Sequence, residues 1–402
     1  MNLKSLEKRL YQLIISRLDG ERVHSEEYRE EVFDLVDKGI GGFILFGGER
    51  EEIRAFIERL QSLSEIPLFI ASDIERGVGQ QIKGSTVFPC QMAVRAAIWE
   101  ENPEDVVILR ESIKAIANEA MDVGINMPLI PVLDVNQNPD NPIICTRAFS
   151  DNPEDVSWFG LEYIGMLEGS GLLSCAKHFP GHGDTWIDSH ISLPVIDKPL
   201  QELMDKDILP FREAVQAGVS SIMAGHLQIP ALDSIPATLS RKVITGLLRE
   251  GLGFHGLVLT DALNMSALSG MDNLAAKCIH AGVDILLHPS DAELTVRELA
   301  SAIRSKVLDE GEIDAAIGRI LKAKSRIHQI MRVEVDYNDH DTLSRQITEM
   351  SITLVKYKGG ILPITENSQM IVVVAGEEKF YMPHLYFPIT QIPLNPPLLK
   401  GD

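Results

Sequence analysis

The chain has 402 residues, of which 45% are hydrophobic and 24% charged, a composition typical of a globular protein with a substantial core. Its formal net charge of −21 argues against nucleic acid as a partner, because binding a polyanion requires clustered Lys and Arg. No apolar stretch reaches the length of about 18 residues that a membrane span needs, no signal-peptide pattern is present, and the four cysteines form no CxxC pair. These features predict a cytoplasmic protein with reduced thiols.

The first predicted element is a helix at the N-terminus, where Leu6, Leu10, Leu13 and Ile14 recur at helical spacing. After it, one pattern repeats along the chain. A polar helical stretch ends near a glycine, and an apolar run of strand length and a polar residue follow. Seven such runs lie in residues 37–49, 65–75, 121–135, 168–178, 216–226, 253–262 and 280–290. An eighth strand is not evident.

Two of the intervening helices carry explicit start signals. Asn102 and Pro103 precede the helical pattern of residues 105–124, and Asn152 and Pro153 precede that of residues 155–169. Strands that alternate with helices over residues 1–330 predict an α/β fold with a parallel sheet. At this length we expect a TIM (β/α)₈-type barrel rather than an open doubly wound sheet.

The C-terminal part of the chain has a different character. We assign residues 1–335 to the barrel, the last predicted helix lying in residues 309–331. Residues 336–380 resemble the start of a second α/β domain, with 370–376 as a buried strand. One strand cannot bury a sheet, so we expect a truncated remnant of that domain. Residues 381–402 are rich in proline and are expected to be poorly ordered.

Titratable side chains follow the apolar runs. In a barrel, the residues that follow the strands meet at one end, where active sites lie. The residues in these places are Asp73, Asp134, Lys177, His178, His226, Asp261 and His288. We call these residues the rim of the barrel. Because they include carboxylates, imidazoles and an amine, they predict catalysis at this end of the barrel.

The segment "AKHFPGHGDTWIDSH", residues 176–190, holds three histidines and two aspartates. Asp188 and His190 are two positions apart, so they face the same side of an extended chain. A carboxylate beside an imidazole raises its basicity, which suits a general acid/base. Two alternatives stay open for this segment: metal ligation by His182, Asp184, Asp188 and His190, or hydrogen-bonded loop residues with a structural role.

Asp261 follows a buried strand in "HGLVLTDALNM" and also has two interpretations. An aspartate in this place can act as a nucleophile or can cap the next helix. Its place on the rim with Lys177 and His178 favours the nucleophile.

Four segments together resemble glycoside hydrolase family 3, in its β-N-acetylglucosaminidase (β-hexosaminidase) branch. They are "KHFPGHGDTWIDSH", "TDALNM", "NPIICTRAF" and "SDIERGVGQQI". The resemblance covers roughly residues 5–335 and implies a TIM barrel with a retaining mechanism. It implies Asp261 as nucleophile, and His190 as acid and then base, held by Asp188. It also implies that Asp73, Arg147, Lys177 and His178 bind sugar hydroxyls.

The expected activity is hydrolysis of terminal N-acetylhexosamine from cell-wall muropeptides or chitin-type oligosaccharides, by an exo-β-N-acetylglucosaminidase. We expect a small carbohydrate substrate, no cofactor or metal, and no obligate protein partner. Another family 3 β-glycosidase, a glycoside phosphorylase, a metal-dependent hydrolase and an impaired sugar-binding remnant stay open. The chain departs from the branch at Gln81, where the branch often has arginine, which leaves the aglycone undetermined.

Overall fold

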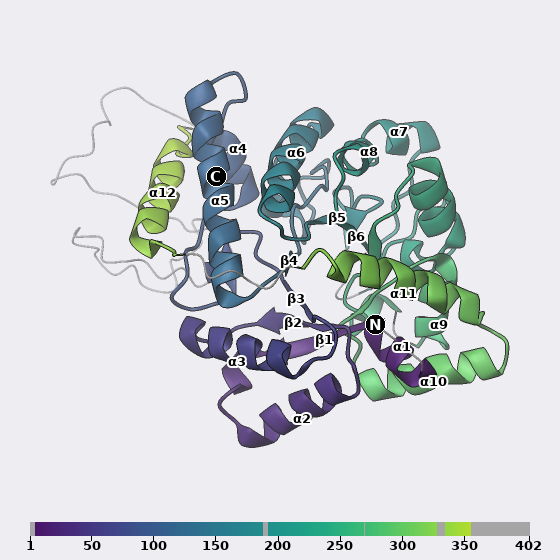
Figure 1. Ribbon diagram of the computed structural model, residues 1–402. Coiled ribbons are helices and arrows are strands. Elements are labelled where there is room, and N and C mark those ends of the chain that lie inside the picture. The colour runs from purple at the N-terminus through teal and green to yellow at the C-terminus, as the bar shows by residue number, and fades with distance from the viewer. Residues whose placement is uncertain (1–4, 188–191, 269, 328–333, 355–402) are drawn as a thin grey trace, which may run out of the picture. The chain divides into compact units, whose positions relative to one another are not determined.

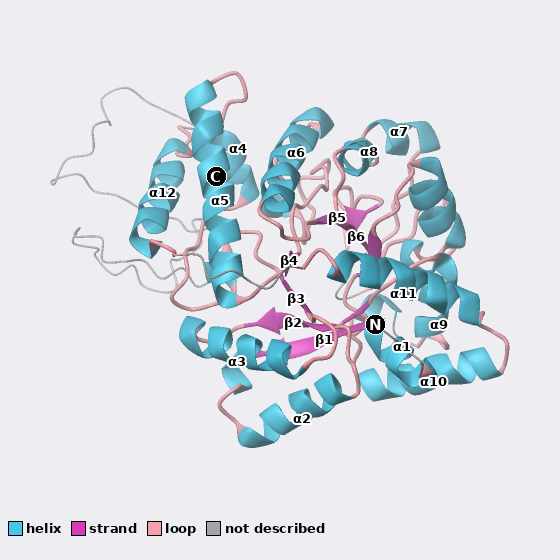
Figure 2. Ribbon diagram, viewed as in Figure 1, coloured by secondary structure: helices cyan, strands magenta, loops and turns pink. Residues whose placement is uncertain are grey.

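Parallel strands lie at the centre of the protein, and helices surround them (Figures 1 and 2). The computed structural model describes residues 5–187, 192–268, 270–327 and 334–354. The strands are β1 Ile14–Asp19, β2 Gly42–Phe46, β3 Phe69–Ser72, β4 Met127–Pro128, β5 Cys175–Phe179, β6 Ser221–Ala224, β7 Leu257–Thr260 and β8 Leu286–Leu287. The α-helices are α1 Leu6–Gln12, α2 Glu26–Asp37, α3 Arg50–Leu63, α4 Gln91–Ala97, α5 Pro103–Val123, α6 Pro153–Gly169, α7 Leu200–Asp205, α8 Leu209–Gln216, α9 Leu274–Ala281, α10 Ala292–Arg304, α11 Glu310–Lys324 and α12 Tyr337–Met350.

The strands form two curled parallel sheets. One has the order β4-β3-β2-β1-β8 and the other β5-β6-β7. Single parallel bridges join the sheets on both sides, between Val132 and Lys177 and between Leu259 and Ile285. The strands therefore follow chain order around a TIM-barrel-like arrangement. The predicted α/β class and all seven predicted strands are confirmed.

The N-terminal prediction is partly wrong. The helix α1 ends at Gln12, and Ile14 opens β1, the strand that the sequence did not reveal. This strand pairs with β2 at Ile15–Gly42 and with β8 at Ile14–Leu286. The spacing of Leu10, Leu13 and Ile14 satisfies a helix and a buried strand equally well over so few residues. Pairing with neighbours on both sides decides in favour of the strand.

The predicted helix starts are confirmed by their caps. The Asn102 side chain accepts the backbone N–H of Glu104 at 3.2 Å at the start of α5, and Asn152 accepts that of Asp155 at 3.0 Å at the start of α6. The helix α5 ends at Val123, and the next residue, Gly124, has a left-handed φ of +94°, which favours a residue without a side chain. These signals are local, which is why the sequence alone reveals them.

The helix α12 packs against α4 and α5. The His340 Nδ1 atom lies 2.7 Å from Glu119 Oε1 on α5, and Ser344 donates a hydrogen bond to the Val87 carbonyl at 2.7 Å. The described residues up to Ile352 belong to one compact unit. The remnant of a second domain predicted over residues 336–380, and the tail over 381–402, fall mostly outside the described residues, so the predicted boundaries stay predictions. Among the described helices, none has the length and apolar character needed to cross a membrane.

Candidate active site

The predicted rim residues meet at the carboxyl ends of the strands. Asp73 follows β3, Lys177 and His178 lie in β5, and Asp261 follows β7. The pairing register between β5 and β6 shifts between Ala176 and Phe179, and such an irregularity re-aims side chains that would otherwise point to opposite faces. Both Lys177 and His178 consequently contact other rim residues.

Glu75 is the anionic centre of this rim. Its side chain is 4% exposed and accepts two hydrogen bonds from Arg147, at 2.9 and 2.7 Å, as well as an ion pair from Lys177 at 2.7 Å. Burial alone raises the pKa of a carboxyl, but the charges of Arg147 and Lys177 outweigh it and hold the pKa of Glu75 well below its usual range. Glu75 is therefore a carboxylate at neutral pH that fixes two cations.

Lys177 is held between two carboxylates. Its ammonium group, only 1% exposed, donates to Asp73 Oδ1 at 2.7 Å and lies 2.7 Å from Glu75 Oε1. Burial lowers the pKa of a lysine, yet Asp73 and Glu75 together raise that of Lys177 above its usual range. Asp73 remains 31% exposed, and Gln81 supports it by donating to its backbone oxygen at 3.2 Å. The Asp73 carboxylate is thus oriented by protein and open to solvent.

Asp134 orients His178. The His178 Nδ1 atom lies 2.6 Å from Asp134 Oδ2, and Asp134 Oδ1 also accepts the backbone N–H of His178 and of His182, at 3.2 and 2.7 Å. Burial raises the pKa of Asp134, but His178 and these hydrogen bonds bring it below its ordinary value. Because the Asp134 carboxylate can only accept, the Nδ1 of His178 carries a proton. The opposite nitrogen, Nε2, lies 3.5 Å from Arg147 Nη2.

Asp261 stands at the end of β7 as a half-buried carboxylate. Its Oδ1 accepts the N–H of Ala262 at 2.7 Å, and its own N–H donates to the Ala224 carbonyl at 3.0 Å. Burial alone would raise the pKa of Asp261. The charges of His178 and His226 have the larger combined effect and bring the pKa below its ordinary value. The alternative role as a helix cap does not apply, because α9 begins at Leu274 with Asn273 before it.

Two further rim histidines have structural contacts. The His226 Nδ1 atom lies 2.8 Å from Thr238 Oγ1 and its Nε2 lies 3.2 Å from the Ala262 carbonyl, so it packs beside Asp261. Burial lowers the pKa of His226 despite the nearby Asp261. His288 packs its ring edge against Phe46, with centroids 6.0 Å apart. His226 therefore supports the strand end that carries Asp261.

The segment after β5 is only partly described. Asp188 and His190 lie outside the described residues, so their predicted roles stay predictions. Of the four residues in the metal alternative, His182 bonds Thr185 at 3.0 Å and Asp184 pairs with Lys198 at 3.0 Å. Gly183 lies so close to the Val135 backbone that an added Cβ would stand 1.8 Å from its oxygen. This glycine is required by close packing.

Glu75 was missed by the sequence analysis, and Arg147 pairs with it. The signal was present, because Glu75 is two positions after Asp73 and thus on the same side of an extended chain. Asp134 was on the predicted rim without an assigned role. Its role depends on the contact between β5 and the segment that follows β4, two parts of the chain far apart in sequence. One hydrogen bond between them runs from the Leu133 N–H to the Lys177 carbonyl, 2.7 Å.

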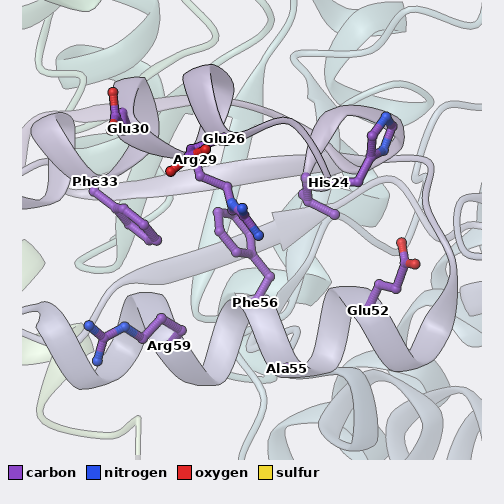
Figure 3. A pocket seen from close by; sticks show the side chains of 10 residues that line it. His24, Glu26, Arg29, Glu30, Phe33, Glu52, Ala55, Phe56 and Arg59 are labelled. Atoms are coloured by element: carbon purple, nitrogen blue, oxygen red, sulfur yellow. The ribbon is translucent and has the colours of Figure 1, made fainter.

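A cavity of about 710 Å³ lies elsewhere, between α2 and α3 (Figure 3). Phe33 on α2 and Phe56 on α3 contact each other inside it, with ring centroids 5.7 Å apart. Its polar lining residues are His24, Glu26, Arg29, Glu30, Glu52 and Arg59. None of these residues belongs to the rim, so the polar cluster at the strand ends remains the candidate active site.

This protein has a TIM-barrel-like fold with a carboxylate-rich cluster at the carboxyl ends of its strands, which is where TIM-barrel enzymes have their active sites. Residues 5–323 match the family model described as the glycosyl hydrolase family 3 N-terminal domain. The chain belongs to glycosyl hydrolase family 3. This confirms the family predicted from the sequence motifs.

Similar proteins include a β-hexosaminidase A of Pseudoalteromonas piscicida, 33% identical over 391 residues. That alignment covers 87% of this chain, which spans only 65% of the relative's length. A family 3 β-N-acetylglucosaminidase from Paenibacillus sp. str. FPU-7 superimposes with a TM-score of 0.80 at 32% identity, covering 88% of this chain and 70% of that one. A β-glucoside phosphorylase, BglX, superimposes with a TM-score of 0.81 at 26% identity, covering 90% of this chain and 68% of that one.

Proposed function

We propose that the protein is a retaining exo-β-N-acetylglucosaminidase that releases terminal N-acetylhexosamine from cell-wall muropeptides or chitin-type oligosaccharides. The observation that carries the proposal is Asp261, an ionised carboxylate at a strand end beside His178 and Lys177. The similarity to a β-hexosaminidase and to a β-N-acetylglucosaminidase supports the choice of sugar.

The reaction proceeds by two successive displacements at the anomeric carbon. In the first, Asp261 forms a bond to the anomeric carbon while the bond to the leaving oxygen breaks, and His190 gives that oxygen its proton. In the second, water attacks the same carbon, His190 takes the water's proton, and the Asp261–sugar bond breaks. Asp188 holds His190 in the orientation for both transfers.

The other rim residues bind the sugar. Asp73 accepts hydrogen bonds from sugar hydroxyl groups. Lys177 has three N–H donors, of which two are directed at Asp73 and Glu75, so the third can donate to the sugar. Arg147 and His178 lie next to it, each fixed by a buried carboxylate. Side chains positioned before the substrate arrives lower the entropic cost of reaching the reactive geometry.

The proposal is tested with 4-nitrophenyl N-acetyl-β-glucosaminide and the matching glucoside. We expect release of 4-nitrophenol from the first at a much higher kcat/KM, with no loss after treatment with a chelator. A preference for the glucoside would contradict the assignment of the sugar. Loss of activity after treatment with the chelator would favour the metal-dependent hydrolase instead.

Phosphorolysis is the second candidate, favoured by the similarity to the β-glucoside phosphorylase. A histidine acid carries no negative charge to repel an incoming phosphate. Inorganic phosphate separates the two reactions, because a phosphorylase forms sugar 1-phosphate and a hydrolase forms the free sugar. We expect free sugar to remain the main product at millimolar phosphate.

Asp134→Asn is expected to lower kcat/KM by roughly 10- to 100-fold, because a hydrogen bond to a charged group contributes about 1.5–3 kcal/mol. Asparagine keeps only one acceptor oxygen, so it cannot accept the two backbone N–H groups of His178 and His182 on one side and the His178 ring N–H on the other, and His178 loses its orientation. Steady-state kinetics measures the change. Asp233→Asn is the matched control, since Asp233 bonds Ser240 at 2.6 Å and no rim residue. Unchanged kcat/KM in Asp134→Asn would show that His178 needs no orienting partner.

A further inference from the structure

A second cavity lies at the end of the barrel opposite to the rim. It has a volume of about 270 Å³ and is formed by the turn of residues 217–220 before β6, the turn of residues 252–256 before β7 and the end of α11 (Figure 1). Because both turns precede their strands, the cavity lies at the amino ends of the strands, away from Asp261. We call it the basic cavity, after its polar lining residues Ser220, His255, Arg319, Lys322 and Arg326.

The charge of this lining is opposite to that of the whole chain. Asp and Glu outnumber Lys and Arg by 58 to 37 in the sequence, yet three cations line the basic cavity and no described Asp or Glu does. Like charges gathered on one concave surface create a local potential that attracts ions of the other sign. The lining therefore selects an anion.

Two carboxylates outside the lining fix the two arginines. Asp284, which is fully buried, accepts from Arg319 Nε at 2.7 Å. Glu168 accepts from Arg326 Nη2 at 2.6 Å, and Arg326 Nη1 donates to Ser220 Oγ at 2.7 Å. A guanidinium has five N–H donors, and the described contacts use two nitrogens on each arginine. Both arginines thus keep donors for a ligand and are oriented before it arrives.

The positive charge around Asp284 exceeds the negative charge. Asp284 is shared with a second guanidinium, because Arg249 Nη2 donates to its Oδ2 at 2.7 Å. Burial lowers the pKa of Arg249, and the charge of Arg319 lowers it further against the effect of Asp284. Arg249 lines an adjoining cavity of about 610 Å³, whose acidic lining residue is the exposed Glu250. An anion beside Arg319 would offset the repulsion between the two guanidinium groups.

The basic cavity also offers donors that have no partner. Lys322 is exposed and makes no hydrogen bond or ion pair with any described residue. Over the same described residues, the backbone N–H groups of Gly253, His255 and Gly256 have no hydrogen-bond acceptor. Gly253 has a left-handed φ of +75°, and an added Cβ there would meet no atom within 4 Å, so no side chain closes the cavity at this turn.

We propose that the basic cavity binds the phosphate group of a small molecule, supplied as inorganic phosphate or as a phosphate monoester. A phosphate group carries about −1.5 to −2 charges at neutral pH, and its several acceptor oxygens match guanidinium donors. Three cations suit this charge better than that of a single carboxylate. The adjoining cavity leaves room for the organic part of a monoester. The inference goes beyond the proposed function and does not depend on it, because no rim residue takes part.

The test is isothermal titration calorimetry with inorganic phosphate and with glucose 6-phosphate, on the wild type and on Lys322→Glu. The variant reverses one lining charge and leaves the ion pairs of Arg319 and Arg326 intact. We expect the Kd of both ligands to rise on the order of 10-fold or more, the usual effect of losing a hydrogen bond to a charged group. Lys322→Met removes the charge without reversing it and is expected to give a smaller rise.

The matched control is Lys114→Glu, which makes the same change in net charge. Lys114 is exposed on α5, makes no hydrogen bond or ion pair with the described residues, and does not line the basic cavity. It is expected to leave both Kd values unchanged. The kcat/KM for 4-nitrophenyl N-acetyl-β-glucosaminide is expected to stay at the wild-type value in Lys322→Glu and in Lys114→Glu, and thermal unfolding checks that each variant is folded.

The outcomes separate a local site from a general effect of charge. If Lys322→Glu weakens binding and Lys114→Glu does not, the site is supported, and the tighter of the two ligands identifies the source of the phosphate. The proposal is overturned if neither ligand binds the wild type at millimolar concentration, if Lys322→Glu leaves both Kd values unchanged, or if both variants weaken binding equally. None of these results bears on Asp261, so the proposed function is tested separately.

Discussion

Asp261→Asn is expected to reduce kcat for 4-nitrophenyl N-acetyl-β-glucosaminide by a factor on the order of 10⁴ or more, the scale of loss when a catalytic residue of a concerted site is removed. Asparagine has nearly the same shape, and its amide oxygen can still accept the Ala262 N–H. It carries no charge, however, so it cannot form the bond to the anomeric carbon. Initial rates of the purified protein measure the loss.

The control for this variant is Asp272→Asn, an exposed carboxylate on the same connection between β7 and α9. It is expected to leave kcat unchanged. Mass spectrometry after reaction with an activated fluorosugar adds an independent readout, since the wild type gains the mass of one sugar and Asp261→Asn does not. A folded Asp261→Asn protein that keeps more than about a hundredth of the activity would remove Asp261 from the role of nucleophile.

Glu75→Ala is expected to lower the free energy of unfolding by about 3–5 kcal/mol at neutral pH, the usual loss when one partner of a buried ion pair is removed. The variant leaves Arg147 without its bidentate partner and leaves buried Lys177 with Asp73 alone. The same change is expected to raise KM, because the sugar-binding cations lose their fixed positions. Urea unfolding and steady-state kinetics measure the two effects.

The matched control for Glu75→Ala is Glu21→Ala. Glu21 pairs with Lys83 at 2.9 Å, but both side chains are more than half exposed, so the pair is screened by water. Its loss is expected to leave the free energy of unfolding nearly unchanged. A comparable loss in the two variants would show that burial does not strengthen the Glu75 contacts.

The contribution of Glu75 is also expected to depend on pH. Its pKa in the folded state is depressed below the ordinary value of 4.5, so the unfolded chain binds the proton first as pH falls. The stabilisation is therefore complete above pH 4.5 and is lost as the pH falls towards the folded pKa. In urea titrations, the difference between wild type and Glu75→Gln is expected to shrink at acidic pH. A difference that stayed constant would contradict a depressed pKa.

The sequence predicted those parts of the fold that depend on neighbouring residues. Asn102 and Gly124 mark the ends of α5, and apolar runs mark β2 to β8, because caps and buried strands leave a local pattern. The strand β1 was not predicted. Its first residues fit the spacing of the preceding helix, and only its pairing with β2 and β8 separates the two.

The candidate site divides in the same way. The sequence by itself determined which residue types follow each strand, and this was enough to select Asp73, Lys177, His178 and Asp261. Only the tertiary structure decided their partners. Glu75 holds Arg147, and Asp134 holds His178, through contacts between segments far apart in the chain. Such pairs are created when the sheet curls and brings distant strand ends together, and no local pattern records which carboxylate meets which cation.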